Sequence, residues 1–189
     1  MPHAVEATPP ALARLVEFVN TRRADGDVIG TPEQLTSWLR AHELLSGGTA
    51  DTTARHRAEG VREGLRALLA ANNAEPVASP RPDGLNPAAR TELAALTAAL
   101  PLTLDVTSTP PRLVPLTAEP VDHALAALLA DVATAVAAGT WSRLKTCREP
   151  SCRWAFYDHS RNRGRTWCSM DVCGNRVKVR ASHRRSAAR

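Results

Sequence analysis

Four cysteines are the residues of this sequence best placed to do chemistry. Cys147, Cys152, Cys168 and Cys173 form the pattern C-x4-C-x15-C-x4-C, which is two close pairs separated by a short segment. A tetrahedral thiolate site requires two such pairs folded around one Zn²⁺, with each sulfur atom about 2.3 Å from the metal. The spacing therefore predicts one structural zinc ion per chain. Two disulfides are the alternative, and the absence of a secretion signal argues against them.

Basic side chains lie close to these cysteines. Four thiolates on one Zn²⁺ carry a net negative charge that nearby donors must compensate. Lys145, Arg148, Arg153 and Arg176 lie within a few residues of the predicted ligands and are expected to donate to sulfur. For Arg176, a pairing with Asp158 is the other expectation. Both Asp158 and Arg176 are therefore assigned to the support of the metal site.

Aromatic residues gather in the same segment. Of the seven Trp, Phe and Tyr residues in the chain, five lie between positions 141 and 167: Trp141, Trp154, Phe156, Tyr157 and Trp167. A module this small cannot bury enough aliphatic surface, so these rings are expected to form a miniature core. Stacking of an exposed ring on a nucleic-acid base is the alternative.

Charge separates the cysteine segment from the rest of the chain. Residues 1–140 hold 11 Lys/Arg and 16 Asp/Glu for a net charge of −5, whereas residues 141–189 hold 13 and 3 for +10. A basic loop between the cysteine pairs and a helix predicted over 169–185 suit phosphate contacts and a major groove. The residues assigned to nucleic-acid binding are Arg161, Arg163, Arg165, Lys178, Arg180, Arg184 and Arg185. The alternatives are a solvated tail, a tail docked on the acidic segment, and a module that binds protein.

A catalytic function is not expected. His159, Asn162, Asn175 and His183 are similar in type to the residues of His-Asn-His nucleases, but their spacing fits that class poorly. Four thiolate ligands also leave no open coordination position for a catalytic metal. The sequence therefore predicts that the protein is not an enzyme.

The cysteine segment resembles a known module. The segments 147–162 and 165–176, the second of which ends in Cys173-Gly174-Asn175-Arg176, closely resemble the CGNR zinc finger. That module forms the C-terminus of bacterial proteins described as stress-induced transcription regulators. The motif Phe18-Val19-Asn20-Thr21 is similar to one in the N-terminal ABATE domain of the same family. The resemblance implies a DNA-binding transcription factor.

The elements that must position these residues are mostly helical. Apolar residues recur at the spacing of one helical face in four segments: 12–19, 35–45, 61–69 and 121–136. The motif Thr31-Pro32-Glu33-Gln34 predicts a capping box at the start of the second helix. Gly60 and Gly64 in the third helix either weaken it or mark a close helix crossing.

A loop, a short helix and a hairpin complete the expected elements. The Pro-rich residues 75–87 predict a loop, and a short helix that follows Asn86-Pro87 is expected to end before Pro101. Residues 102–107 alternate apolar and polar side chains, the pattern of a half-buried strand. Residues 113–116 can form the partner strand. Pro115 has no N–H to donate, so that partner is expected to be an edge strand of the sheet.

These signals together predict an α+β fold in two modules. Residues 1–140 are expected to form a helix-rich domain with one β-hairpin that folds alone, and residues 141–189 a four-cysteine zinc ribbon or treble clef. The first module would sense a small-molecule effector or self-associate as a homodimer. Asn20 is either a hydrogen-bonding residue at a helix end or part of a ligand site. The sequence starts without the features of a secretory leader and contains no long uninterrupted apolar run. We therefore expect a cytoplasmic protein without a membrane segment.

Overall fold

Helices build the N-terminal part of the chain. The computed structural model describes residues 8–23, 25–73, 88–149, 151–175 and 179. The helices are α1 (Pro10–Val19), α2 (Pro32–Ala41), α3 (Thr52–Ala71), α4 (Ala89–Thr97) and α5 (Pro120–Ala137). We call the described residues up to 139 the body and those from 141 the cysteine module. The predicted loop over 75–87 lies outside the described residues.

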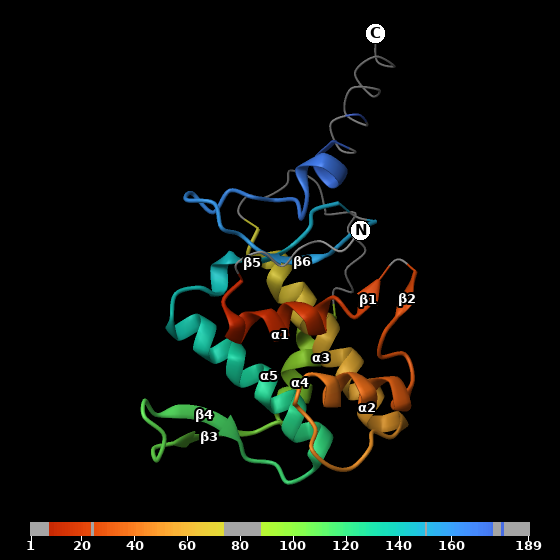
Figure 1. Cartoon of the computed structure of the whole chain (residues 1–189), viewed down its shortest axis with the longest axis vertical. Coiled ribbons are helices and arrows are strands. Elements are labelled where there is room, and N and C mark those ends of the chain that lie inside the picture. Colours follow the sequence, from red (N-terminus) through yellow and green to blue (C-terminus); the bar gives the residue numbers. More distant parts are fainter. Residues whose placement is uncertain (1–7, 24, 74–87, 150, 176–178, 180–189) are drawn as a thin grey trace.

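Three two-stranded antiparallel sheets accompany the helices. They pair β1 (Arg22–Arg23) with β2 (Gly26–Asp27), β3 (Leu102–Asp105) with β4 (Arg112–Pro115), and β5 (Leu144–Thr146) with β6 (Ala155–Tyr157). A 3-10 turn, η1 (Trp141–Arg143), leads into β5, and a π-helical turn, η2 (Met170–Gly174), follows the last sheet. The α+β fold is therefore confirmed, but the body holds two hairpins, β1–β2 and β3–β4, where the sequence predicted one. Figure 1 shows the cysteine module stacked on one end of the helical body.

Local sequence signals explain where the helices begin and end. The Thr31 hydroxyl accepts from the Gln34 N–H at 3.3 Å, and the Gln34 side chain accepts from the Thr31 N–H at 3.0 Å. These two bonds are the predicted capping box. After α5, Gly139 adopts a φ of +65°, the left-handed conformation that commonly ends a helix.

Two glycines of α3 allow α4 to lie directly against it. A Cβ added to Gly64 would lie 2.4 Å from Cβ of Leu93, and one added to Gly60 would lie 2.6 Å from a methyl carbon of Leu96. At Gly64 the obstacle is a Cβ atom and the Ala89 carbonyl, so no side chain fits there while α4 keeps its place, whereas at Gly60 only the end of the Leu96 side chain would have to move. The glycines mark a close helix crossing, which is the second of the two interpretations considered for them.

The body has one continuous apolar core. It is formed by the inner faces of α1, α2, α3 and α5. Within the described residues, α5 is the one helix long and apolar enough to cross a membrane by length and composition. Its residues Val121, Leu125 and Leu128 are fully buried among the other helices, as in the core helix of a globular domain.

The β3–β4 hairpin departs from the expected burial. Leu104 pairs with Leu113 in the register, and Leu102 packs against the core. Leu104 and Val106, however, are 56% and 71% exposed. The prediction of a half-buried strand is therefore wrong for these two residues, because the hairpin projects past the edge of α5 (Figure 1).

The β5–β6 hairpin belongs to two cores at once. Leu144 and Ala155 are buried in the core of the body, whereas Phe156 packs among the cysteines. This division follows from the strand itself, since successive side chains point to opposite faces. The body core therefore continues past position 140. Independent folding of residues 1–140 stays a prediction, and that fragment would expose the surface that covers Leu144 and Ala155.

Candidate metal centre

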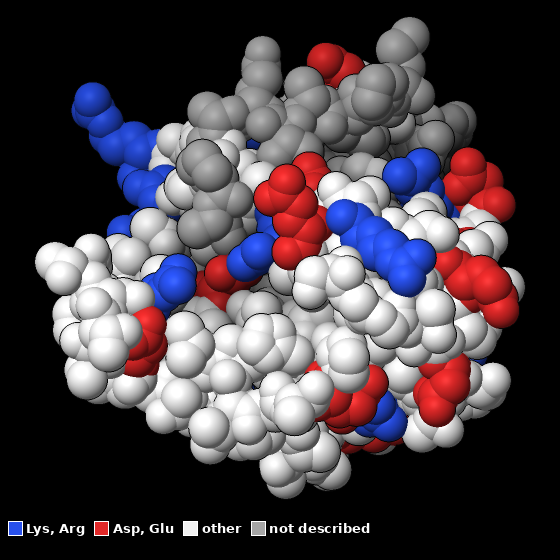
Figure 2. Space-filling view, turned by 60° about the horizontal axis from the view of Figure 1, so that its bottom comes forward, with Lys and Arg blue, Asp and Glu red and all other residues white. Residues whose placement is uncertain are grey.

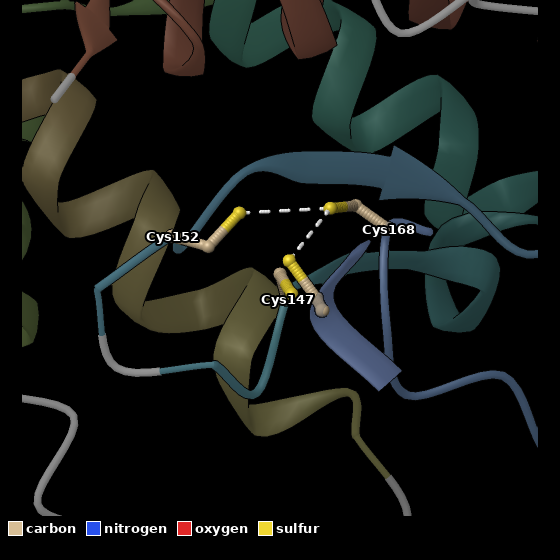
Figure 3. Close-up of side chains that lie close together, drawn as sticks. Cys147, Cys152 and Cys168 are labelled. Atoms are coloured by element: carbon tan, nitrogen blue, oxygen red, sulfur yellow. Dashed lines mark hydrogen bonds between the residues drawn. The ribbon is translucent and has the colours of Figure 1, made fainter. Parts of the chain in front are cut away.

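The four cysteine sulfur atoms converge on one point. All four lie within 4.8 Å of one another, with 3.5 Å between Cys152 and Cys168 and 3.8 Å between Cys168 and Cys173. Figure 3 shows the sulfur atoms of Cys147, Cys152 and Cys168 directed toward each other. Tetrahedral Zn²⁺ with bonds of 2.3 Å separates its sulfur ligands by about 3.8 Å. The donor set therefore fits zinc, and the four cysteines are free rather than disulfide-bonded.

Tight turns bring each pair of cysteines together. We call residues 147–152, between β5 and β6, the first knuckle. Its turn closes where the N–H groups of Cys152 and Arg153 donate to the Glu149 carbonyl at 2.9 and 3.2 Å. The Cys147 N–H donates to the Trp154 carbonyl at 2.8 Å and joins the two ends of the knuckle.

The second pair of cysteines lies at the start of a helix. Cys168 is followed by Ser169, whose hydroxyl accepts from the Val172 N–H at 3.3 Å and caps η2. Cys173 lies in the turn that this cap begins. The expected helix over 169–185 therefore starts at the metal site as predicted, and apart from Val179 its course beyond Asn175 lies outside the described residues.

Hydrogen bonds among the thiols separate their pKa values. Bonds donated by Cys147 and Cys168 lower the pKa of Cys152 to about 2. The bond to Cys152 raises the pKa of Cys147 to about 12, and bonds to both of these sulfurs raise the pKa of Cys168 as well. A metal ion bound among these sulfurs would replace their protons, because the thiolate is the form in which cysteine binds a metal.

A buried ion pair organises the segment between the two pairs of cysteines. Nζ of Lys145 lies 2.7 Å from Oδ2 of Asp158, and the two side chains are 1% and 0% exposed. Nζ also donates to the carbonyls of Arg163 and Arg165. Asp158 in turn accepts from the N–H groups of Ser160 and Arg165 at 2.9 and 3.0 Å. Together these bonds determine how the chain reaches Cys168.

The ion pair bears on the roles that the sequence suggested for Lys145 and for Asp158. All three N–H bonds of the Lys145 ammonium are directed to oxygen atoms, so the prediction that Lys145 donates to sulfur is wrong. Burial acts to raise the pKa of Asp158, but hydrogen bonds from Lys145 and Ser160 outweigh it and hold that pKa below its usual value. Arg176, the partner expected for Asp158, lies outside the described residues.

The basic loop has one arginine directed to solvent and two with partners in the protein. The Arg165 guanidinium donates to the carbonyls of Trp167 and Cys168 and lies 5.0 Å from the centre of the Phe156 ring. Arg163 donates to the Ser142 hydroxyl at 2.9 Å. Arg161 is exposed. Nucleic-acid binding by these residues stays a prediction, and the remaining candidates lie outside the described part of the chain: Lys178, Arg180, Arg184 and Arg185.

The aromatic residues divide between the two cores. Trp154, Phe156 and Trp167 pack with the cysteines, which is the predicted miniature core. Trp141 and Tyr157 pack against the body instead. The prediction of one five-ring cluster is therefore only partly right, because the β5–β6 hairpin has a face toward each core.

Side chains of the body bind the backbone of the cysteine module. Asn20, at the end of α1, donates to the Ala155 carbonyl at 3.0 Å and accepts from the Ala155 N–H at 2.7 Å. Asn20 thus lies at a helix end, but its side chain bonds to a distant strand and not to its own helix. Its membership of a ligand site stays a prediction.

Three residues of α3 and its C-terminal end make similar contacts. Arg66 donates to the Arg153 carbonyl at 3.0 Å, and Asn73 donates to the Thr146 carbonyl at 2.9 Å. Asn72 donates to the carbonyls of Trp141 and Leu144, both at 2.9 Å. Sequence analysis did not identify these three residues. Their partners are backbone carbonyls, which leave no signal in a sequence.

Two family models cover nearly the whole chain. Residues 12–139 match the ABATE model, which carries the description "Putative stress-induced transcription regulator". The chain belongs to the ABATE family. Residues 143–186 match the CGNR zinc finger, so the suspected family is confirmed. A search of curated proteins found no relative that matches.

This ABATE protein thus carries a zinc finger whose ligand set is complete. The CGNR match includes all four cysteines, and their sulfur geometry is that of a single tetrahedral ion. The centre holds one zinc ion in a structural role. Bound there, zinc supplies the cross-link that joins the two knuckles of a module too small to hold them by apolar packing alone.

Proposed function

We propose that this ABATE-family protein is a cytoplasmic bacterial transcription regulator that binds DNA through residues 141–189, and that it is not an enzyme. The observation that carries the proposal is the charge of residues 141–189, which is +10 against −5 for the rest of the chain. Phosphate neutralisation by Lys and Arg supplies most of the affinity in non-specific DNA binding. A basic zinc module on an acidic body concentrates that affinity at one end of the molecule.

The distribution of charge over the body supports the same assignment. Figure 2 shows acidic and basic side chains interspersed among broad uncharged areas on the face at the bottom of Figure 1. Ion pairs such as Arg14–Asp131 and Arg57–Asp122 account for basic residues of the body. A phosphate backbone would find little net attraction there. The exposed Arg161, in contrast, lies in the segment that carries the positive charge.

The second candidate is a zinc-stabilised module that binds protein instead of DNA. It is favoured by apolar side chains at the start of the last helix, since Met170 and Val172 are both exposed. Exposed apolar residues near one another commonly mark a protein contact. In either case the body would supply sensing of an effector or self-association.

A salt series with the zinc-loaded full chain tests the proposal. Binding to random duplex DNA should weaken with salt, with a log–log slope of roughly −5 if about six basic groups contact phosphate. Arg161→Ala should reduce that slope by roughly 1. Arg14→Ala, which removes a charge from the body, is the matched control and should leave it unchanged.

The outcome separates the two candidates. Undetectable binding at about 50 mM salt, where phosphate contacts are strong, would reject direct DNA binding and favour the protein-binding module. If binding is found, selection of sequences from a random DNA pool with the full chain identifies the operator.

A further inference from the structure

We infer that the body forms part of the zinc site. Three body side chains, Asn20, Arg66 and Asn73, hold the first knuckle in the geometry that binds metal, and we call them the clamp. Metal affinity would then depend on residues outside the segment that matches the zinc finger, residues 143–186. The inference concerns the zinc site alone and does not rest on DNA binding.

The clamp holds the chain on both sides of the first knuckle. Asn73 donates to the carbonyl of Thr146, the residue directly before Cys147. Arg66 donates to the carbonyl of Arg153, the residue directly after Cys152. Both donors come from α3 and its C-terminal end, so a single helix sets the separation between the two ends of the knuckle.

The exit from the knuckle needs particular support. Arg153 has a φ of +50°, a left-handed conformation that is uncommon for a residue with a side chain. Arg66 binds the carbonyl of this residue, and Asn20 pairs with both backbone groups of Ala155, two residues further on. The clamp therefore holds the backbone where the chain turns away from Cys152 and enters β6.

The clamp side chains are buried, and one of them is anchored by further bonds. Asn20, Arg66 and Asn73 are 5%, 3% and 5% exposed, so water cannot readily replace them. The Arg66 guanidinium also donates to the Glu63 carboxylate at 3.0 Å and to the Val19 carbonyl. A guanidinium anchored at Nε and Nη2 in this way presents Nη1 in one direction, toward the Arg153 carbonyl. Hydrogen bonds made directly to metal ligands orient them, and the clamp acts one residue further out, on the backbone next to Cys147 and Cys152.

Coupling between the clamp and the metal must act in both directions. If the clamp favours the arrangement that binds zinc, then zinc must favour the arrangement in which the clamp is formed. Zinc should therefore stabilise the body as well as the cysteine module, by an amount that falls when a clamp residue is removed.

Full-length Asn73→Ala tests the inference by chelator competition for zinc. Loss of a residue that supports metal ligands typically weakens metal binding about 10- to 100-fold, and we expect a zinc Kd about 10-fold higher. Asn72→Ala is the matched control. Asn72 is the neighbouring residue of the same type and makes two hydrogen bonds to the module, but its partners Trp141 and Leu144 lie further from Cys147. It should lower the Tm and leave the zinc Kd near that of the wild type.

Two outcomes would overturn the inference. One is an unchanged zinc Kd in Asn73→Ala, and the other is an equal loss of affinity in Asn72→Ala, since that would mean that any contact with the body matters. Arg66→Met repeats the test at the other end of the knuckle and decides it if Asn73→Ala does not fold. Zinc should raise the Tm of Arg66→Met less than it raises the Tm of the wild type, and an equal rise contradicts the clamp.

Discussion

Replacing Lys145 with Met should strongly destabilise the cysteine module. The substitution keeps the length of the side chain and removes the charge that faces Asp158. Three oxygen atoms lose a donor at the same time: Oδ2 of Asp158 and the carbonyls of Arg163 and Arg165. An uncompensated carboxylate would then remain in a site that solvent does not reach.

The magnitude follows from the remaining partners of Asp158. Removing one member of a buried ion pair typically costs 3–5 kcal/mol. Asp158 would keep hydrogen bonds from Ser160 and from the Arg165 N–H, which continue to stabilise its charge. We therefore expect the low end of that range, a loss of about 3 kcal/mol in the free energy of unfolding. This corresponds to more than a 100-fold change in the unfolding equilibrium.

Urea unfolding of the full chain at a fixed free zinc concentration measures this loss. Arg14→Met is the control, because it breaks a more exposed Arg–Asp pair in the body and should cost less. If Lys145→Met costs no more than Arg14→Met, the buried pair does not organise the module and the argument fails.

Three further predictions concern the metal, a helix crossing and an ion pair. The wild type should retain one zinc ion per chain in native mass spectrometry, whereas Cys168→Ser should lose it and unfold the tail around the site. Gly64→Ala should cost roughly 1–3 kcal/mol in urea unfolding because α4 must shift, and Gly47→Ala, where the added Cβ meets open space, should not. Burial of Asp27 acts to raise its pKa, but hydrogen bonds and charge from Arg62 outweigh burial, and the net pKa is lowered. Ionised Asp27 therefore stabilises the folded protein above the unfolded pKa of about 3.9, and this stabilisation is lost as the pH falls below that value. The stability difference between wild type and Asp27→Asn should therefore shrink in acid, and a difference that is constant with pH would contradict the assignment.

The sequence predicted those features that depend on neighbouring residues. The capping box at Thr31 and the spacing of the cysteines are local patterns, and each is present as expected. The glycines of α3 left two interpretations open, because only the position of α4 decides between them. Local chemistry was sufficient to predict the ligands of the metal.

The support of the metal site was not predictable in the same way. Lys145 stands two residues before a ligand, so a bond to sulfur was the natural expectation. In the structure Lys145 lies opposite Phe156 in the β5–β6 register, and Asp158 follows Phe156 by two residues on the same face. That pairing depends on strand register rather than on distance along the chain. Contacts of Asn72 and Asn73 with carbonyls were invisible for a related reason, since every residue carries a carbonyl.

The junction between α5 and β5 also has a consequence for chimeric proteins. Only three residues separate the end of α5 at Ala137 from η1, and Asn72 binds the carbonyl of Trp141 directly after them. A fusion that joins these 49 C-terminal residues to a foreign domain at Thr140 would transfer every cysteine ligand and none of the donors from α1 and α3. A transplanted finger of this kind would need those donors rebuilt on its new host. The exchangeable unit is therefore the whole chain, although its sequence divides cleanly in two.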